Sequence, residues 1–165
     1  MSRGITFSII SFFFLFPLSV LGGNPLDVVI NEIAWMGTQV EGVESKNWWR
    51  YEWVELYNNT NQIIDLSNWE IENAGSSGKT LKISQGEIPP QGYFLICKKE
   101  LDFCNFISWS LSLNNDYKEN GKLVLKDGEE KIIDQTPEPE NKNWPAGDNE
   151  TKQTMERIKI GRAHV

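Results

Sequence analysis

Short runs of β-branched, aromatic and aliphatic residues recur along this chain, and clusters of Asn, Gly, Pro and Ser separate them. The first three runs lie at residues 27–35, 52–57 and 63–72. No long window after the N-terminal segment shows the 3.6-residue period of an amphipathic helix. Because short strands divided by turn signals are typical of a sandwich or a barrel, we expect an all-β fold.

The second half of the chain continues this pattern. The Asp127-Gly128 pair favours a tight turn, and therefore a β-hairpin with one strand on each side of it. The apolar run at residues 93–97 predicts a central strand, because strands buried on both faces lose their polar alternation. The strands predicted here are 80–83, 93–97, 106–113, 122–126, 130–134 and 154–159.

Residues 1–23 have the order of a secretory signal peptide. Arg3 gives a positively charged start, residues 5–21 are an apolar run, and Gly22 and Gly23 supply small residues for cleavage. An uncleaved anchor is the alternative, because the run is near the shortest that can span a bilayer. We therefore expect a secreted or cell-surface protein that meets a membrane only if this segment is retained.

Residues 160–165 read IGRAHV, which resembles the translation of a common sequencing adapter. We interpret them as a library artefact, with a natural tail as the alternative. On this interpretation the only histidine, His164, contributes no chemistry, and the gene continues beyond Lys159. Residues 24–159 then form one β domain that is truncated at its C-terminal end.

Residues 24–159 are numerous enough for one domain, which at this size buries about two-thirds of the surface of its unfolded chain. Without Arg3 and Arg162, 14 basic residues remain against 23 acidic ones, a net charge near −9. Binding to phosphate backbones requires clustered Lys and Arg, so this composition disfavours nucleic acid as a partner. Without a usable histidine, most catalytic triads are excluded as well.

Cys97 and Cys104 are the only cysteines in the chain. In an exported protein an even number of cysteines permits one disulfide, and two buried free thiols are the alternative. The bridge would close a short loop and stabilise the fold by about 2–3 kcal/mol. A metal site would need further ligands, and no histidine is available to supply one.

Several polar residues inside or beside the apolar runs are candidates for chemistry: Asn31, Glu32, Glu52, Glu55 and Asp65. The first four could gather oxygen ligands for calcium, the one cofactor that this pattern suggests, or the acids could form an acid/base pair. We favour a structural role, in which the carboxylates accept hydrogen bonds from backbone N–H groups of adjoining bends. We expect Asp65 to bond the backbone of its own bend. No metal site is predicted.

Trp48, Trp49 and Tyr51 lie at the end of the polar loop before the second strand. Neighbours in an extended chain point to opposite faces, so we expect at least one of the two tryptophans to be exposed. Exposed aromatic residues could stack on a sugar ring or form a protein-binding hot spot, and the alternative is that they close one end of the fold. Three tryptophans within strand runs are predicted to be buried: Trp35, Trp53 and Trp69.

Five short motifs occur in a characteristic order: INEI at 30–33, EWVEL at 52–56, DLSNW at 65–69, PQGYFL at 90–95 and the hairpin at 123–128. In this order they resemble the lamin tail domain, a module of nuclear lamins that also occurs in exported bacterial proteins. The resemblance covers nearly all of residues 24–159 and implies an immunoglobulin-like β-sandwich. The family has no shared catalytic residue, so the resemblance implies a non-enzymatic module of the exported bacterial type.

We therefore expect a non-catalytic interaction or anchoring module of an exported or cell-surface protein, whose partner is an unidentified protein or a cell-surface polysaccharide. One alternative is a carbohydrate-binding module that uses exposed Trp and Tyr side chains. Another is an accessory domain of a larger enzyme, such as a nuclease, whose catalytic part is encoded beyond Lys159. The fold alone does not decide among them, because function depends on the site.

Overall fold

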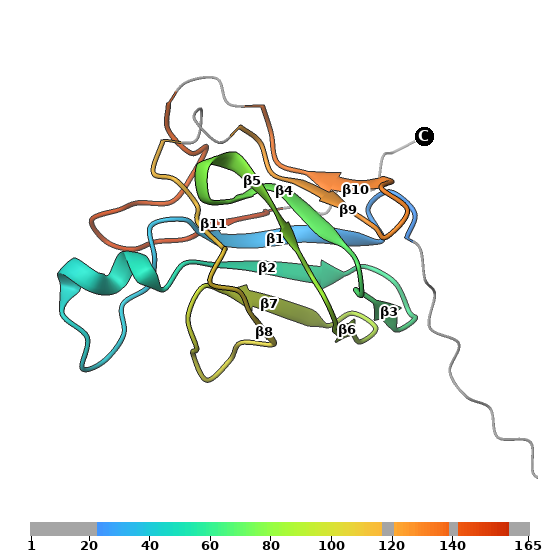
Figure 1. Cartoon of the computed structure of the whole chain (residues 1–165), viewed down its shortest axis with the longest axis horizontal. Coiled ribbons are helices and arrows are strands. Elements are labelled where there is room, and N and C mark those ends of the chain that lie inside the picture. The colour runs from blue at the N-terminus through green and yellow to red at the C-terminus, as the bar shows by residue number, and fades with distance from the viewer. Residues whose placement is uncertain (1–22, 117–120, 139–141, 159–165) are drawn as a thin grey trace, which may run out of the picture.

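Two β-sheets pack face to face in the computed structural model, which describes residues 23–116, 121–138 and 142–158 (Figure 1). The five-stranded sheet has the order β11 (Met155–Glu156), β1 (Val28–Ala34), β2 (Trp53–Asn58), β7 (Tyr93–Cys97), β8 (Phe106–Ile107). The four-stranded sheet has the order β10 (Ile132–Gln135), β9 (Val124–Lys126), β4 (Glu70–Gly75), β5 (Lys79–Lys82). The other described elements are the strand pair β3 (Ile64–Asp65) and β6 (Glu87–Ile88) and the 3-10 helices η1 (Ser45–Arg50) and η2 (Ser76–Gly78).

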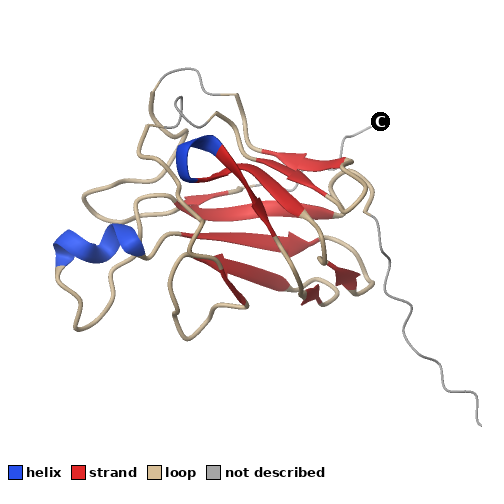
Figure 2. Ribbon diagram, viewed as in Figure 1, coloured by secondary structure: helices blue, strands red, loops and turns tan. Residues whose placement is uncertain are grey.

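The strands are antiparallel to their neighbours except for β7 and β8, which run parallel. Figure 2 shows that strands dominate the described chain; of the short helical segments, η1 ends the loop before β2 and η2 joins β4 to β5. The central pairings are long: β2 pairs with β7 from Trp53 opposite Cys97 to Tyr57 opposite Tyr93. The predicted all-β, immunoglobulin-like β-sandwich is therefore confirmed.

Alternating side chains from both sheets fill the space between them. Ile33, Leu56 and Ile96 project inward from the five-stranded sheet and are almost completely buried. Ile71 and Leu125 approach them from the four-stranded sheet and belong to the same cluster. Because apolar burial stabilises the fold by roughly 25 cal/mol for each Å² removed from water, this layer dominates the stability of the sandwich.

The three tryptophans predicted to be buried are buried. Trp35 and Trp69 belong to the core between the sheets. Trp53 lies instead in a second, smaller cluster with Ala34 and Cys97. The prediction of burial is confirmed, but the sequence did not indicate that Trp53 would lie on the other face of its sheet.

A β-bulge interrupts the pairing of β1 with β2. The register shifts between Ile30 and Glu32, so that Asn31 has no partner of its own in this pairing. Ile30 and Ile33 are both core residues although three positions separate them, which a regular strand does not allow. The bulge therefore reverses the alternation of β1 and turns Glu32 away from the core.

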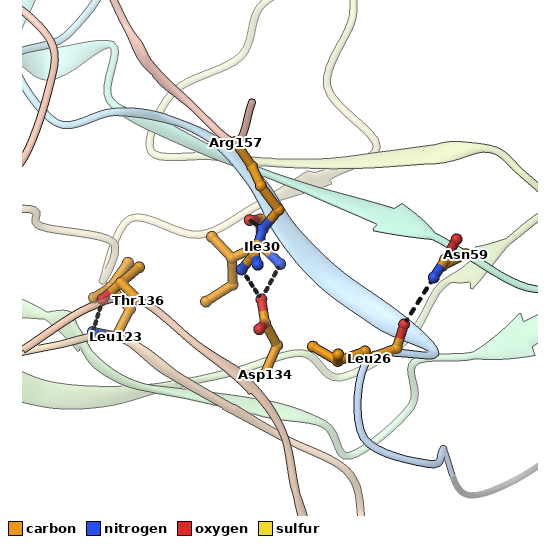
Figure 3. Close-up of polar contacts among 7 residues, drawn as sticks. All are labelled: Leu26, Ile30, Asn59, Leu123, Asp134, Thr136 and Arg157. Carbon is orange, nitrogen blue, oxygen red and sulfur yellow. Dashed lines mark hydrogen bonds and ion pairs between the residues drawn. The ribbon is translucent and has the colours of Figure 1, made fainter. Parts of the chain in front are cut away.

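A buried carboxylate joins the edges of the two sheets beside this bulge (Figure 3). Asp134 of β10 accepts hydrogen bonds from the Ile30 backbone N–H (2.8 Å) and from Arg157 Nη2 (2.6 Å). Arg157 follows β11, and its Nε donates to the Ile30 carbonyl oxygen (3.1 Å). Burial raises the pKa of Asp134, and the Ile30 N–H and the charge of Arg157 oppose this change. The three residues hold β10, β1 and β11 together.

The strand predicted at residues 106–113 is much shorter in the structure. Only Phe106–Ile107 is a strand, paired in parallel with the end of β7. The chain then turns, with the Leu111 N–H donating to the Ser108 carbonyl oxygen (3.0 Å), and Leu111 forms only an isolated bridge with Gly75 of β4. The prediction was therefore too long at its C-terminal end.

The predicted hairpin forms, but its loop differs from the tight turn that we expected. The strands β9 and β10 are separated by residues 127–131, and the positive φ of 65° falls on Glu130 rather than on Gly128. The buried Asp127 carboxylate accepts the N–H groups of Glu129 and Lys131, both at 3.0 Å. These two hydrogen bonds stabilise the longer loop.

Two predictions concern parts of the chain outside this description. Of the signal peptide predicted at residues 1–23, only Gly23 is described, and residues 160–165 are outside the described residues altogether. Within the described ranges, none of the helices is long and apolar enough to cross a membrane.

Candidate functional site

Every second residue of the central strands points away from the four-stranded sheet, and we call that side of the five-stranded sheet the outer face. Because Leu56 of β2 is a core residue, its neighbours Glu55 and Tyr57 lie on the outer face. The register of β2 with β7 brings Leu95 and Tyr93 beside them. The outer face therefore carries apolar and acidic side chains together.

Four large apolar side chains on and beside this face are strongly exposed: Trp109 (71%), Tyr93 (52%), Phe103 (48%) and Ile107 (41%). We call these four residues the outer apolar surface. Tyr93 packs against Tyr57 with ring centroids 4.9 Å apart. Ile107 lies beside Cys97 in the register of β7 with β8 and therefore points outward with it. The sequence analysis did not single out any of the four.

Lys99 connects Trp109 to the sheet. Its Nζ lies 5.4 Å from the ring centroid of Tyr51 and 5.6 Å from that of Trp109, so that one ammonium contacts two aromatic rings. Lys99 forms no ion pair with any residue that the structure describes. The cation positions the indole of Trp109 while most of that indole remains in contact with solvent.

A disulfide joins Cys97 and Cys104, with their Cα atoms 6.0 Å apart. The short loop that it closes carries Phe103, whose ring meets the ring of Trp53 nearly edge-on at a centroid distance of 6.3 Å. Cys97 and Trp53 are both buried in the small cluster on the outer face. The bridge therefore fixes the loop that places Phe103 over Trp53.

Two of the predicted acids, Glu32 and Glu55, lie opposite each other on β1 and β2, and Glu156 of β11 lies on the far side of Glu32. Asn31 Nδ2 donates to Glu55 Oε1 (2.8 Å), and the Thr154 hydroxyl contacts Glu32 Oε1. Burial raises the pKa of Glu55, the hydrogen bond from Asn31 opposes the rise, and the charges of Glu32 and Glu156 add to it. Within the described ranges, no three His, Cys, Asp or Glu side chains are placed to hold a metal ion.

Glu52 lies on the opposite side of the sheet from Glu55, so the structure does not bring it together with Glu32 and Glu55. Its side chain is 6% exposed, and Oε2 accepts hydrogen bonds from Lys98 Nζ (2.9 Å) and from the Leu113 N–H (3.2 Å). Burial raises the pKa of Glu52 to about 7, although Lys98 and the Leu113 N–H both act to lower it. A carboxylate held in this way is an ion pair within the fold rather than a surface charge.

Asp65, the fifth polar candidate, ends the short strand β3. Its Oδ1 accepts a hydrogen bond from the Ser67 N–H at 2.8 Å, the contact of an Asx turn. The structure thus places Asp65 in its own bend.

Trp48, Trp49 and Tyr51 come from η1 and the residue after it, and their side chains diverge. The half-buried Trp48 donates its indole N–H to the Val43 carbonyl oxygen (3.0 Å) across the loop. Trp49 is 50% exposed, with Lys98 Nζ 4.9 Å from its ring centroid, whereas Tyr51 faces Lys99. The three rings therefore do not form one platform.

The turn at Gly37 holds η1 close to β1. Gly37 has a φ of +78°, and a Cβ atom at this position would lie only 2.0 Å from the Trp48 carbonyl oxygen. The Thr38 N–H donates to the same oxygen (3.3 Å). Glycine is required here both by the positive φ and by this close approach, and it thereby determines where Trp49 lies.

A cavity of about 360 Å³, which we call the end cavity, opens where η1 meets the ends of β2 and β7. Its lining residues are Trp49, Glu52, Ser77, Lys98, Ser112, Leu113, Asn114 and Asn115. All but Trp49 and Leu113 are polar. A second cavity of about 420 Å³ lies along β1, β10 and β11, next to the contact of Arg157 with β10.

The two packed, mostly antiparallel sheets define an immunoglobulin-like β-sandwich. Its outer face carries both apolar and acidic side chains. In a comparison with protein families, the family model of the Lamin Tail Domain matches residues 23–141. The chain belongs to the lamin tail domain family, as its motifs indicated. No curated protein matches the chain. The immunoglobulin-like fold of this family is consistent with a non-catalytic module.

Proposed function

We propose that this chain is a non-catalytic, exported interaction module that binds a protein partner through the outer face of its five-stranded sheet. The observation that carries the proposal is the outer apolar surface, in which Tyr93, Phe103, Ile107 and Trp109 are each more than 40% exposed. Large exposed apolar patches are uncommon on soluble monomers and mark interaction sites. Tyr and Trp are also the residue types that dominate binding hot spots.

The surface is preorganised, which favours binding over a structural role. The disulfide holds the loop of Phe103, and Lys99 holds Trp109 against the sheet. Tyr93 packs on Tyr57, whose hydroxyl donates to Gln91 Oε1. Side chains that are already ordered lose less conformational entropy on binding, so they contribute more to affinity.

The charges beside the outer apolar surface indicate the chemistry of the partner. Glu32, Glu55 and Glu156 form an acidic row across β2, β1 and β11. This row would repel the phosphates of nucleic acids and of anionic lipids, which supports a protein partner. The partner is therefore a protein surface in which apolar side chains stand next to Lys or Arg.

Two observations support export to the cell surface or the medium, in the manner of the bacterial lamin tail proteins. The order of charged, apolar and small residues in segment 1–23 is that of a signal peptide. The disulfide between Cys97 and Cys104 belongs to an oxidising compartment, because thiols in the cytosol are kept reduced.

The proposal is tested by panning a random peptide library displayed on phage against the purified chain. We expect enriched peptides that combine aromatic or aliphatic residues with Lys or Arg, and Trp109→Ala should weaken their binding by about tenfold or more. The matched control is Ile132→Ala, because Ile132 is 50% exposed but belongs to the four-stranded sheet. Peptides that bind Trp109→Ala as well as the original chain, or that are mainly acidic, would contradict the proposal.

A further inference from the structure

The end cavity lies apart from the outer face and has a different character. Glu52 and Lys98 point inward and line this cavity. Their neighbours in sequence, Tyr51 and Lys99, point outward and contact each other. Ser77 of η2 reaches the same cavity from the side of the four-stranded sheet. The cavity therefore opens at the end of the sandwich, and a ligand there would leave the outer apolar surface uncovered.

Trp49 gives the end cavity an exposed aromatic wall. Half of the Trp49 side chain is accessible, and Lys98 Nζ and Arg50 Cζ lie 4.9 Å and 5.3 Å from its ring centroid. The turn at Gly37 fixes the position of η1 and so of this ring. The indole is thus an ordered apolar surface with polar groups beside it. Such a surface suits a ligand that has one apolar face and hydroxyl groups around its edge.

The ion pair on the opposite wall retains hydrogen-bonding capacity. Both hydrogen bonds that Glu52 accepts from described residues, those of Lys98 and of the Leu113 N–H, go to Oε2. Glu52 Oε1 can therefore accept a further hydrogen bond. An ammonium has three N–H donors, and Lys98 uses one of them for Glu52. An acceptor and a donor thus stand side by side, as a pair of neighbouring hydroxyl groups would require.

The charge of the cavity excludes other ligand classes. Lys98 is paired with Glu52 at 2.9 Å, and the Glu52 carboxylate in the same lining would repel a phosphate or a uronic acid. A predominantly apolar side chain from a peptide would cover Glu52 Oε1 without offering it a hydrogen-bond donor, which costs binding energy. A neutral ligand that carries many hydroxyl groups fits both conditions.

We propose that the end cavity binds one neutral pyranose unit of a polysaccharide, stacked on Trp49 and hydrogen-bonded to Glu52 and Lys98. The C–H groups on one face of the sugar ring lie against the part of the indole that remains exposed beside Lys98 and Arg50. Two adjacent hydroxyl groups meet Glu52 Oε1 and the Lys98 ammonium. The site operates independently of the outer face, so that one module could hold a protein and a polysaccharide at the same time.

The test is affinity electrophoresis of the full chain in gels that contain neutral glucan, mannan or galactan, with polygalacturonate as the anionic polymer. We expect at least one neutral polymer to retard the chain and polygalacturonate to have no effect. Trp49→Ala should lower the affinity by about tenfold or more, and Glu52→Gln should lower it by a smaller factor, because the amide still accepts a hydrogen bond. Trp49→Phe should restore part of the binding that Trp49→Ala loses.

The matched control is Trp109→Ala, which removes an equally large exposed indole from the outer face. It should leave polysaccharide binding unchanged while it weakens peptide binding by about tenfold or more, and Trp49→Ala should show the reverse. The proposal is overturned if no neutral polymer retards the chain, if polygalacturonate is the only polymer that does, or if Trp49→Ala binds as well as the original chain. A thermal melt of each variant shows whether the fold is intact.

Discussion

Replacement of Glu52 by Gln should change how the stability of the domain depends on pH. The Glu52 side chain is 6% exposed, and its burial outweighs the effect of Lys98 and of the Leu113 N–H. As a result, the pKa of this carboxyl rises from 4.5 to about 7 on folding. Gln has nearly the same shape and can accept the same two hydrogen bonds, but it does not titrate.

The sign of the effect follows from proton binding. A carboxyl with a raised pKa holds its proton more tightly in the folded than in the unfolded state, so folding is favoured at low pH. Stability should therefore fall as the pH rises from about 4.5 to about 7, and should change little from this group above that range. Since one pKa unit corresponds to about 1.36 kcal/mol, the loss between pH 5 and pH 8 is about 2–3 kcal/mol.

The assay is urea unfolding of the original chain and of Glu52→Gln at pH 5 and at pH 8. Between pH 5 and pH 8, the unfolding free energy of the original chain should fall by about 2–3 kcal/mol more than that of the variant. Glu129→Gln, which changes an exposed carboxylate, serves as the control and should retain the dependence of the original chain. If Glu52→Gln also retains it, burial of Glu52 does not control this titration and the reasoning is wrong.

Three further changes test other parts of the structure. Cys97→Ser combined with Cys104→Ser should lower the unfolding free energy by about 2–3 kcal/mol, and the original chain should show no reactive thiol under denaturing, non-reducing conditions. Asp134→Ala should lower the unfolding free energy in urea by about 3–5 kcal/mol, because Arg157 and the Ile30 N–H lose their acceptor. A change below about 1 kcal/mol would show that Asp134 does not hold β10, β1 and β11 together. Gly37→Ala should lower the unfolding free energy by about 2 kcal/mol or more and weaken polysaccharide binding, because the added Cβ would displace η1. A variant as stable as the original chain would contradict the close packing of this turn against Trp48.

The strands were predictable from the sequence because their signals are local. The apolar run of β7 was predicted with the bounds that it has, and β1 and β2 differ from their predictions by about one residue at each end. The β8 region was predicted too long, since after Ile107 the chain turns and pairs with β4 only through an isolated bridge of Leu111 with Gly75. The geometry of the turns was harder to predict than the strands: a tight turn was expected at Asp127-Gly128, but the positive φ falls on Glu130.

The candidate site was harder to predict because its parts meet through register and through distant contacts. Strand alternation alone would have separated Glu52 from Glu55, since three positions place them on opposite faces. Strand alternation does not predict the bulge at Asn31, and this bulge is the reason that Glu32 faces outward. The position of Lys99 between Tyr51 and Trp109 depends on the pairing of three strands, which no local pattern encodes.

The most direct test of the proposed function is to map where a bound peptide contacts the chain. The backbone amide NMR signals of the isotope-labelled chain would be followed during titration with a peptide enriched by panning. The account predicts that the largest shifts occur in β7, β8 and the disulfide loop, around Tyr93, Phe103 and Ile107. Shifts that concentrate in β9 and β10 of the four-stranded sheet would contradict it.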